Sequence, residues 1–114
     1  MNKKTWQKFI DRDGSCPHCG DEATLVPHHR KNRGMGGSKK LDTPSNIMAI
    51  CAELNGLLES NATIAGMGRD FGFKLTAGQV PSEVPIYVNG KWLLLDDEFN
   101  RVEVKAIKRE DYEL

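Results

Sequence analysis

Apolar residues along this chain gather in short stretches, and the spacing within each stretch predicts the element that it forms. Near the start, Trp6, Phe9 and Ile10 stand three or four positions apart, which places them on one face of a helix. Thr5 has a side chain suited to capping the start of this helix, and Gly14 is suited to ending it. We therefore expect a short amphipathic helix here.

The middle of the chain predicts two short strands followed by a helix. Residues 23–29 are predicted to be extended, residues 30–45 to form a glycine-containing loop, and residues 46–51 to form a second, apolar strand. Over residues 52–65, leucines and an isoleucine recur at helical spacing, and the sequence Gly-Met-Gly at residues 66–68 is expected to end that helix. This pattern predicts a compact strand–strand–helix unit.

A small antiparallel sheet is predicted near the end of the chain. Two strand-like stretches within residues 86–95 surround Asn89-Gly90, a dipeptide that favours a two-residue hairpin turn, and a third strand is expected over residues 101–104. Residues 80–85 are the expected joint between this sheet and the preceding unit. Together the elements predict an α+β fold.

Length and composition narrow the class of protein. The 114 residues suffice for a single domain, and no stretch approaches the roughly 18 apolar residues of a membrane span. The start of the chain lacks the apolar core of a signal peptide. Three cysteines cannot close a disulfide framework, so Cys16-Pro17-His18-Cys19 is interpreted as a metal knuckle. We expect a cytoplasmic protein with no membrane partner.

The formal net charge is zero, which argues against a protein that coats nucleic acid by bulk charge. The stretch from residue 28 to residue 40 nevertheless holds five cations and no acid. Such cations could contact DNA phosphates and position a duplex without reading its sequence, or they could form an ordinary solvated loop. The five candidates are Arg30, Lys31, Arg33, Lys39 and Lys40.

The adjacent pair His28-His29 ends the first predicted strand. Neighbouring strand residues point to opposite faces, so one imidazole can bind a metal while the other does a different task if the strand end bends. Asn46 begins the second predicted strand, and Asn55 lies on the predicted helix, where it can approach a strand-end histidine. Imidazole and amide ligands suit a divalent ion that retains water. Taken singly, each residue is explained as well by a surface or capping position.

In combination these residues resemble the HNH endonucleases, whose ββα-metal (His-Me finger) motif joins a cysteine knuckle, a His-His pair, a glycine-containing loop and an asparagine. The residues that carry the resemblance are Cys16-Pro17-His18-Cys19-Gly20, His28-His29, Gly36-Gly37, Asn46, Cys51, Leu54 and Asn55. They span residues 13–66, which would be the ββα-metal core of a single domain covering residues 1–114. Residues 67–114 are similar to the β extension of small phage-borne members.

The resemblance implies a role for each residue. His28 and Asn55 would hold one catalytic divalent ion (Mg²⁺, Mn²⁺, Ni²⁺ or Zn²⁺), His29 would be the general base, and Asn46 would fix the loop and orient His29. The implied function is nicking or cutting of DNA by phosphodiester hydrolysis, in a phage or prophage protein acting inside the bacterial host cell. A homodimer or the packaging terminase subunits are the partners that it suggests.

The resemblance also implies a structural zinc on Cys16, Cys19 and Cys51. Where the family has a fourth cysteine, this chain has Leu54, so a site completed by water or histidine and a site without zinc both stay open. Two other functions stay open as well. One is a noncatalytic zinc-knuckle module that binds nucleic acid or protein, and the other is a hydrolase for a small phosphoester.

Overall fold

The computed structural model describes residues 1–32 and 39–104, and within them it has an α+β fold, as predicted. The α-helices are α1 (Lys3–Asp13), α2 (Ala52–Ser60) and α3 (Ala62–Asp70). The strands are β1 (Leu25–His29), β2 (Ile47–Cys51), β3 (Ile86–Val88), β4 (Lys91–Leu95) and β5 (Arg101–Val104). Two short 3-10 helices are η1 (Lys39–Leu41) and η2 (Pro81–Glu83). Across the described segments, no helix has the length and apolarity needed to cross a membrane.

Helix α1 begins earlier than the sequence predicted. Its N-cap is Asn2, whose side-chain oxygen accepts a hydrogen bond from the Thr5 backbone N–H at 2.8 Å, so the expected capping role of Thr5 is wrong. Asn2 has the stronger capping side chain, and it leaves Thr5 inside the first turn. The helix ends at Gly14, which has a φ of +73°, as predicted. Phe9 is buried on the face that packs inward.

Strands β1 and β2 form an antiparallel hairpin, and α2 follows β2 without a linker. In the register His28 pairs with Met48 and Leu25 pairs with Cys51. All five residues of β2 are buried, because both α1 and α2 pack against this strand. The predicted strand–strand–helix order is therefore present, and the register places the start of β1 beside the start of α2, which packs against both strands.

The single helix predicted over residues 52–65 is wrong, because the chain breaks at Asn61. The backbone of Asn61 is extended, and its side chain caps α3 by accepting hydrogen bonds from the N–H groups of Thr63 and Ile64, each at 3.0 Å. Gly68, expected to end the helix, lies inside α3. A Cβ atom there would lie 2.5 Å from a Leu58 side-chain carbon, so this glycine permits close packing of the two helices.

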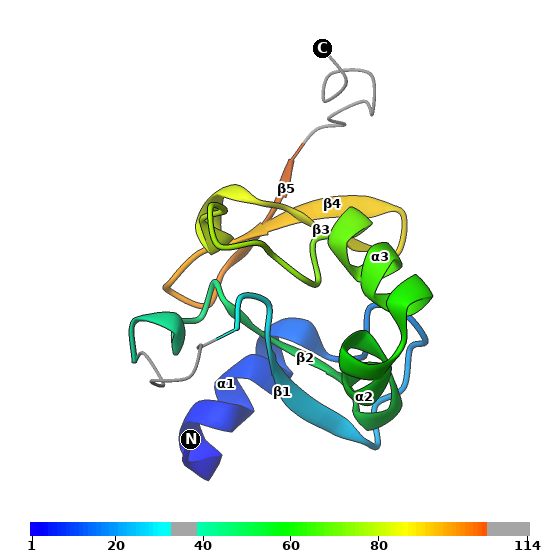
Figure 1. Ribbon diagram of the computed structural model, residues 1–114. Helices are drawn as coiled ribbons and strands as arrows, with labels where there is room; N and C mark the ends of the chain where they lie inside the picture. Colours follow the sequence, from blue (N-terminus) through cyan, green and yellow to red (C-terminus); the bar gives the residue numbers. More distant parts are fainter. Residues whose placement is uncertain (33–38, 105–114) are drawn as a thin grey trace.

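The C-terminal sheet has the strand order β3-β4-β5 and is antiparallel, as predicted. Asn89 and Gly90 both have positive φ, 49° and 81°, which is the backbone that the two-residue turn requires. Figure 1 shows this sheet lying across the hairpin, with α2 and α3 at one end. The two sheets share one apolar core, which includes Met48, Ile50, Leu54, Leu58, Phe73, Ile86, Leu93 and Leu95.

Arg30 follows β1 directly and bonds to the segments before β2 and β3. Its predicted contact with DNA phosphate is wrong. The side chain is 1% exposed, and all of its described hydrogen bonds go to backbone carbonyls. The accepting oxygens belong to Ser45, Gly72, Pro81 and Val84, at 2.6 to 2.9 Å. Burial, together with the charge of Arg12, lowers the pKa of Arg30 to about 10. Residues 80–85 are thus bonded to the hairpin.

Candidate functional site

His28 lies in the interior at the end of β1. It is 4% exposed, and its Nε2 lies 2.6 Å from the carbonyl oxygen of Phe73. A carbonyl oxygen only accepts hydrogen bonds, so Nε2 carries the proton and Nδ1 keeps its lone pair. Burial lowers the pKa of His28, although hydrogen bonds with Phe73 and Asn55 raise it in part. His28 is therefore a neutral imidazole with one nitrogen able to bind a cation.

Asn55, in the first turn of α2, is near enough to His28 for its side chain to raise the pKa of that imidazole. The structure thus brings together the two residues predicted to hold a divalent ion. Glu59 stands one helical turn after Asn55, and its negative charge raises the pKa of His28. Lys74 lowers that pKa, and its Nζ lies 3.4 Å from a Glu59 carboxylate oxygen.

Glu59 did not enter the sequence prediction, although its spacing of four from Asn55 on a predicted helix was a signal for it. An imidazole nitrogen, an amide oxygen and a nearby carboxylate form a donor set that fits a divalent cation. Because His28 is neutral, the cation would meet no positive charge on that ligand. The residues present therefore fit the ion that the resemblance implies.

His29 makes a separate contact at the strand end. Its Nε2 lies 2.8 Å from Oδ1 of Asp42, in a pair whose side chains are 29% and 38% exposed. The partners of His28 and His29 differ, as expected for neighbouring residues on opposite faces of a strand. Sequence reasoning missed Asp42, although it is the first acidic residue after the wholly basic stretch.

Asn46 is fully buried and holds the loop that separates the strands. Its Oδ1 accepts a hydrogen bond from the N–H of Lys31 at 2.9 Å. Its Nδ2 donates to the carbonyls of Lys31 and Leu41, at 3.0 and 2.9 Å. The two bonded segments adjoin His29 on one side and Asp42 on the other. This geometry agrees with the loop-fixing role predicted for Asn46, and its influence on His29 is indirect.

The remaining basic candidates are placed in different ways. Lys31 is partly buried, with Nζ 3.2 Å from the carbonyl oxygen of Gln79, and Lys40 is exposed in η1. Arg33 lies outside the described residues, and so does the side chain of Lys39. Of the five cations predicted to contact DNA, Lys31 and Lys40 are therefore the two whose described side chains reach the surface.

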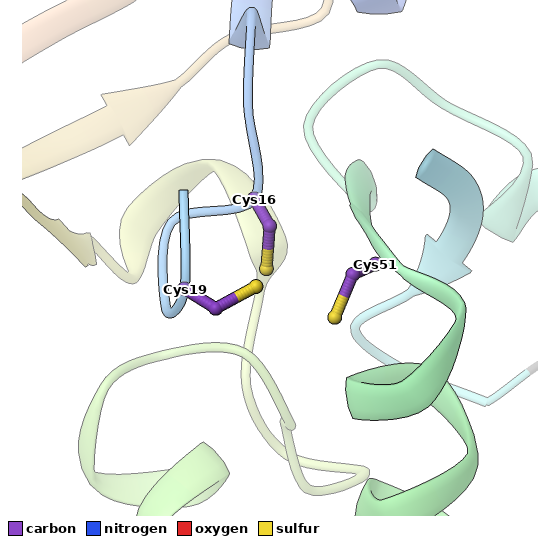
Figure 2. A group of neighbouring side chains, drawn as sticks. All are labelled: Cys16, Cys19 and Cys51. Atoms are coloured by element: carbon purple, nitrogen blue, oxygen red, sulfur yellow. The ribbon is translucent and has the colours of Figure 1, made fainter. Parts of the chain in front are cut away.

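The three cysteines converge on one point. Their sulfur atoms all lie within 4.8 Å of one another, with Cys16 and Cys51 buried and Cys19 exposed. Figure 2 shows the two knuckle thiols facing the thiol of Cys51, which stands where β2 passes into α2. Among the residues that the structure describes, no histidine or carboxylate joins them. Leu54 is 3% exposed and belongs to the apolar core.

The cysteine cluster has the donors that a soft metal needs. Burial raises the pKa of the Cys51 thiol to about 11. Burial also acts to raise the pKa of Cys16, but hydrogen bonds from the backbone of Cys51, Cys19 and His18 lower it below its ordinary value. Metal binding replaces the thiol protons, so these three sulfurs can serve as thiolate ligands. They fit three positions of a tetrahedral zinc site, with the fourth left to a ligand from outside this cluster.

Comparisons of the chain with protein-family models, with curated proteins and with solved structures found no match. The chemical roles of these residues therefore depend on their geometry and on the resemblance described above.

Proposed function

We propose that the protein is a metal-dependent DNA endonuclease of the HNH type, which nicks DNA by hydrolysing phosphodiester bonds. The observation that supports this proposal is the position of His28 beside Asn55, where the hairpin meets α2. A neutral imidazole beside an amide side chain, with a carboxylate one helical turn after that amide, is a set of donors that suits a divalent cation. Asn46 contributes by fixing the loop that follows the histidines.

Each residue in the site has a distinct task in this reaction. His28 offers Nδ1 as a ligand while Phe73 holds its other ring nitrogen, and Asn55 offers its amide oxygen. When bound, a divalent ion supplies positive charge that stabilises the scissile phosphate as negative charge develops. His29 takes a proton from the attacking water. Lys31 and Lys40 are the described members of the basic stretch that would contact DNA phosphates.

A structural zinc on Cys16, Cys19 and Cys51 is part of the same proposal. It would tie the knuckle to the N-terminus of α2, because Cys51 caps that helix by accepting a hydrogen bond from the Leu54 N–H at 3.3 Å. Asn55 lies on the same helix, one turn after Cys51. The zinc would therefore hold in place the element that brings Asn55 to His28, and water would be its fourth ligand.

The test is the conversion of supercoiled plasmid to nicked and linear forms in Mg²⁺, Mn²⁺, Ni²⁺, Zn²⁺ or EDTA. We expect nicking that depends on metal and that falls by about 100-fold or more in His29→Ala, the size typical of a lost general base. Asn55→Ala should lose activity as well. Asn100→Ala is the matched control, because Asn100 is exposed and its side chain bonds to Asp96 in a surface turn. Equal activity in all four proteins would overturn the proposal.

A noncatalytic binding module is the second candidate, and the burial of His28 favours it. A side chain that is 4% exposed and bonded to a backbone carbonyl can also be explained as a satisfied core histidine. The two functions differ in one observation. A binding module retains DNA or protein affinity with no cleavage in any ion, whereas the nuclease loses cleavage and retains DNA binding in His29→Ala.

A further inference from the structure

We propose that Asp42 is the residue that positions His29. It holds the imidazole ring with the Nε2–H group directed at its carboxylate, and so makes Nδ1 the nitrogen that can accept a proton. The catalytic meaning of this contact rests on the proposed nuclease function, whereas the contact itself does not. Asp42 does not touch the reacting atoms in this scheme, and it acts through His29.

The geometry fixes which ring nitrogen bears the proton. The distance of 2.8 Å between Nε2 of His29 and Oδ1 of Asp42 is that of a good hydrogen bond. An ionised carboxylate only accepts hydrogen bonds, so the proton must lie on Nε2. Nδ1 then keeps its lone pair. A histidine that can present either nitrogen is thereby restricted to one tautomer and one orientation.

The position of Asp42 is set by the buried part of the loop. Exposed ion pairs are weak when their two side chains are free to rotate. A partly exposed pair therefore needs a rigid backbone if it is to hold His29 in one orientation. Asn46 supplies that rigidity by bonding to Lys31, two residues after His29, and to Leu41, directly before Asp42. The backbone N–H of Arg30 also donates to the carbonyl of Asn46 at 2.8 Å.

These bonds tie the two ends of the loop together through one buried amide. His29, at the end of β1, and Asp42, directly after η1, lie near these two joined ends, and their side chains meet there. An orienting carboxylate keeps a catalytic imidazole in the productive tautomer and stabilises it when it gains a proton. The same chemistry is available to the Asp42 carboxylate here.

The first test reads the contact directly and needs no activity. In a ¹H–¹⁵N spectrum of the imidazole groups, we expect a cross-peak from the Nε2–H of His29, assigned by its loss in His29→Gln. The hydrogen bond protects that proton from exchange with water. The cross-peak should persist in Asp70→Ala, a matched control at the exposed end of α3, and disappear in Asp42→Ala. Its absence in the unaltered protein, or its persistence in Asp42→Ala, would overturn the inference.

The second test measures nicking at saturating metal and DNA. We expect Asp42→Ala to lower kcat by about 10- to 100-fold, the usual cost of removing an orienting partner, with KM and DNA affinity unchanged. Asp42→Asn should lie between, because its amide oxygen can still accept from Nε2–H without the charge. Wild-type kcat in a folded Asp42→Ala protein would refute the catalytic part of the inference. Failure of the unaltered protein to nick in any ion would instead remove the proposed function, while the cross-peak still decides the contact.

Discussion

Asn46 and Lys31 exchange two hydrogen bonds across the mouth of the loop, from the Lys31 N–H to Oδ1 at 2.9 Å and from Nδ2 to the Lys31 carbonyl at 3.0 Å. With the third bond to Leu41, every described polar atom of this buried amide is used. The amide thus replaces the ladder bonds that the hairpin lacks where its strands separate. A single buried residue therefore joins the two ends of the loop.

Asn46→Ala should therefore be strongly destabilising. It removes three hydrogen bonds and leaves buried backbone groups without partners, a loss of about 2–4 kcal/mol in the free energy of unfolding. Urea denaturation followed by circular dichroism measures this change. Asn100→Ala is the control, because that asparagine is exposed and bonds to Asp96 in a surface turn. A cost under about 1 kcal/mol for Asn46→Ala would contradict its assigned role.

Arg30→Met should lower the free energy of unfolding by about 3–5 kcal/mol, as expected when a buried, fully bonded charge is lost and its partners stay buried. Four carbonyl oxygens would lose their donor. Arg30→Lys should recover little, since one ammonium cannot reach all four oxygens in the planar arrangement of a guanidinium. Arg69→Met, on the exposed side of α3, is the control for the loss of an arginine. Similar stability of the two Met variants would contradict this account of Arg30.

For the DNA binding that we propose, the burial of Arg30 predicts a weaker salt dependence than the sequence alone did. Five phosphate contacts would give a slope of log affinity against log salt of roughly −4.5, whereas the four that exclude Arg30 give at most roughly −3.6. Lys31→Gln and Lys40→Gln should each reduce the magnitude of that slope by about 0.9. Fluorescence anisotropy with a labelled duplex at several salt concentrations measures it. A slope steeper than −4 would show that cations outside this set touch the DNA.

The pH dependence of stability should report on His28. Its folded-state pKa lies below the ordinary value of 6.5, so below pH 6.5 the unfolded chain binds a proton that the folded chain resists. The free energy of unfolding should therefore fall as the pH decreases from 6.5, and it should be insensitive to this group above that value. Measured in EDTA, His28→Gln should flatten this part of the profile relative to that of the unaltered protein. A His28→Gln profile parallel to that of the unaltered protein would contradict the assignment.

Local signals in the sequence predicted much of the fold. Asn89-Gly90 fixed a turn because few residues accept positive φ at two successive positions, and the spacing of Phe9 within its stretch was sufficient to predict α1. The break at Asn61 was missed because the apolar spacing continues across it. A capping asparagine within a helical pattern has no effect on that spacing, although its side chain can start a second helix.

Long-range contacts explain what the sequence could not show of the site. In the sequence, Arg30 cannot be distinguished from its basic neighbours, because the carbonyl groups that bind its side chain come from distant segments of the chain. Asp42 and Glu59 could have been noticed from their positions in the sequence. No local sequence pattern, however, indicated that Asp42 would lie near His29 or Glu59 near His28. The proximity of His28 to Asn55 was expected through a resemblance, and it required α2 to pack against β1.

The cysteine cluster leads to the last prediction, which concerns metal removal. The purified protein should contain about one zinc per chain, and Co²⁺ in its place should give thiolate-to-metal absorption of the strength expected for three sulfurs. Chelation should lower the melting temperature, because a metal bound only by the folded state stabilises that state. Cys51→Ser should abolish the effect of the chelator, since it removes a thiolate ligand while the serine oxygen can still cap α2.

Cys19→Ser separates the ligand role from the packing role, because Cys19 is exposed and contributes little to the core. It should weaken zinc binding while leaving the metal-free protein as stable as the parent in chelator. Loss of plasmid nicking in step with zinc content would then tie the cluster to the position of Asn55 on α2, one turn from the cysteine that caps it. Zinc-free protein with an unchanged melting temperature and three freely titrating thiols would show instead that the cysteines pack as ordinary reduced side chains.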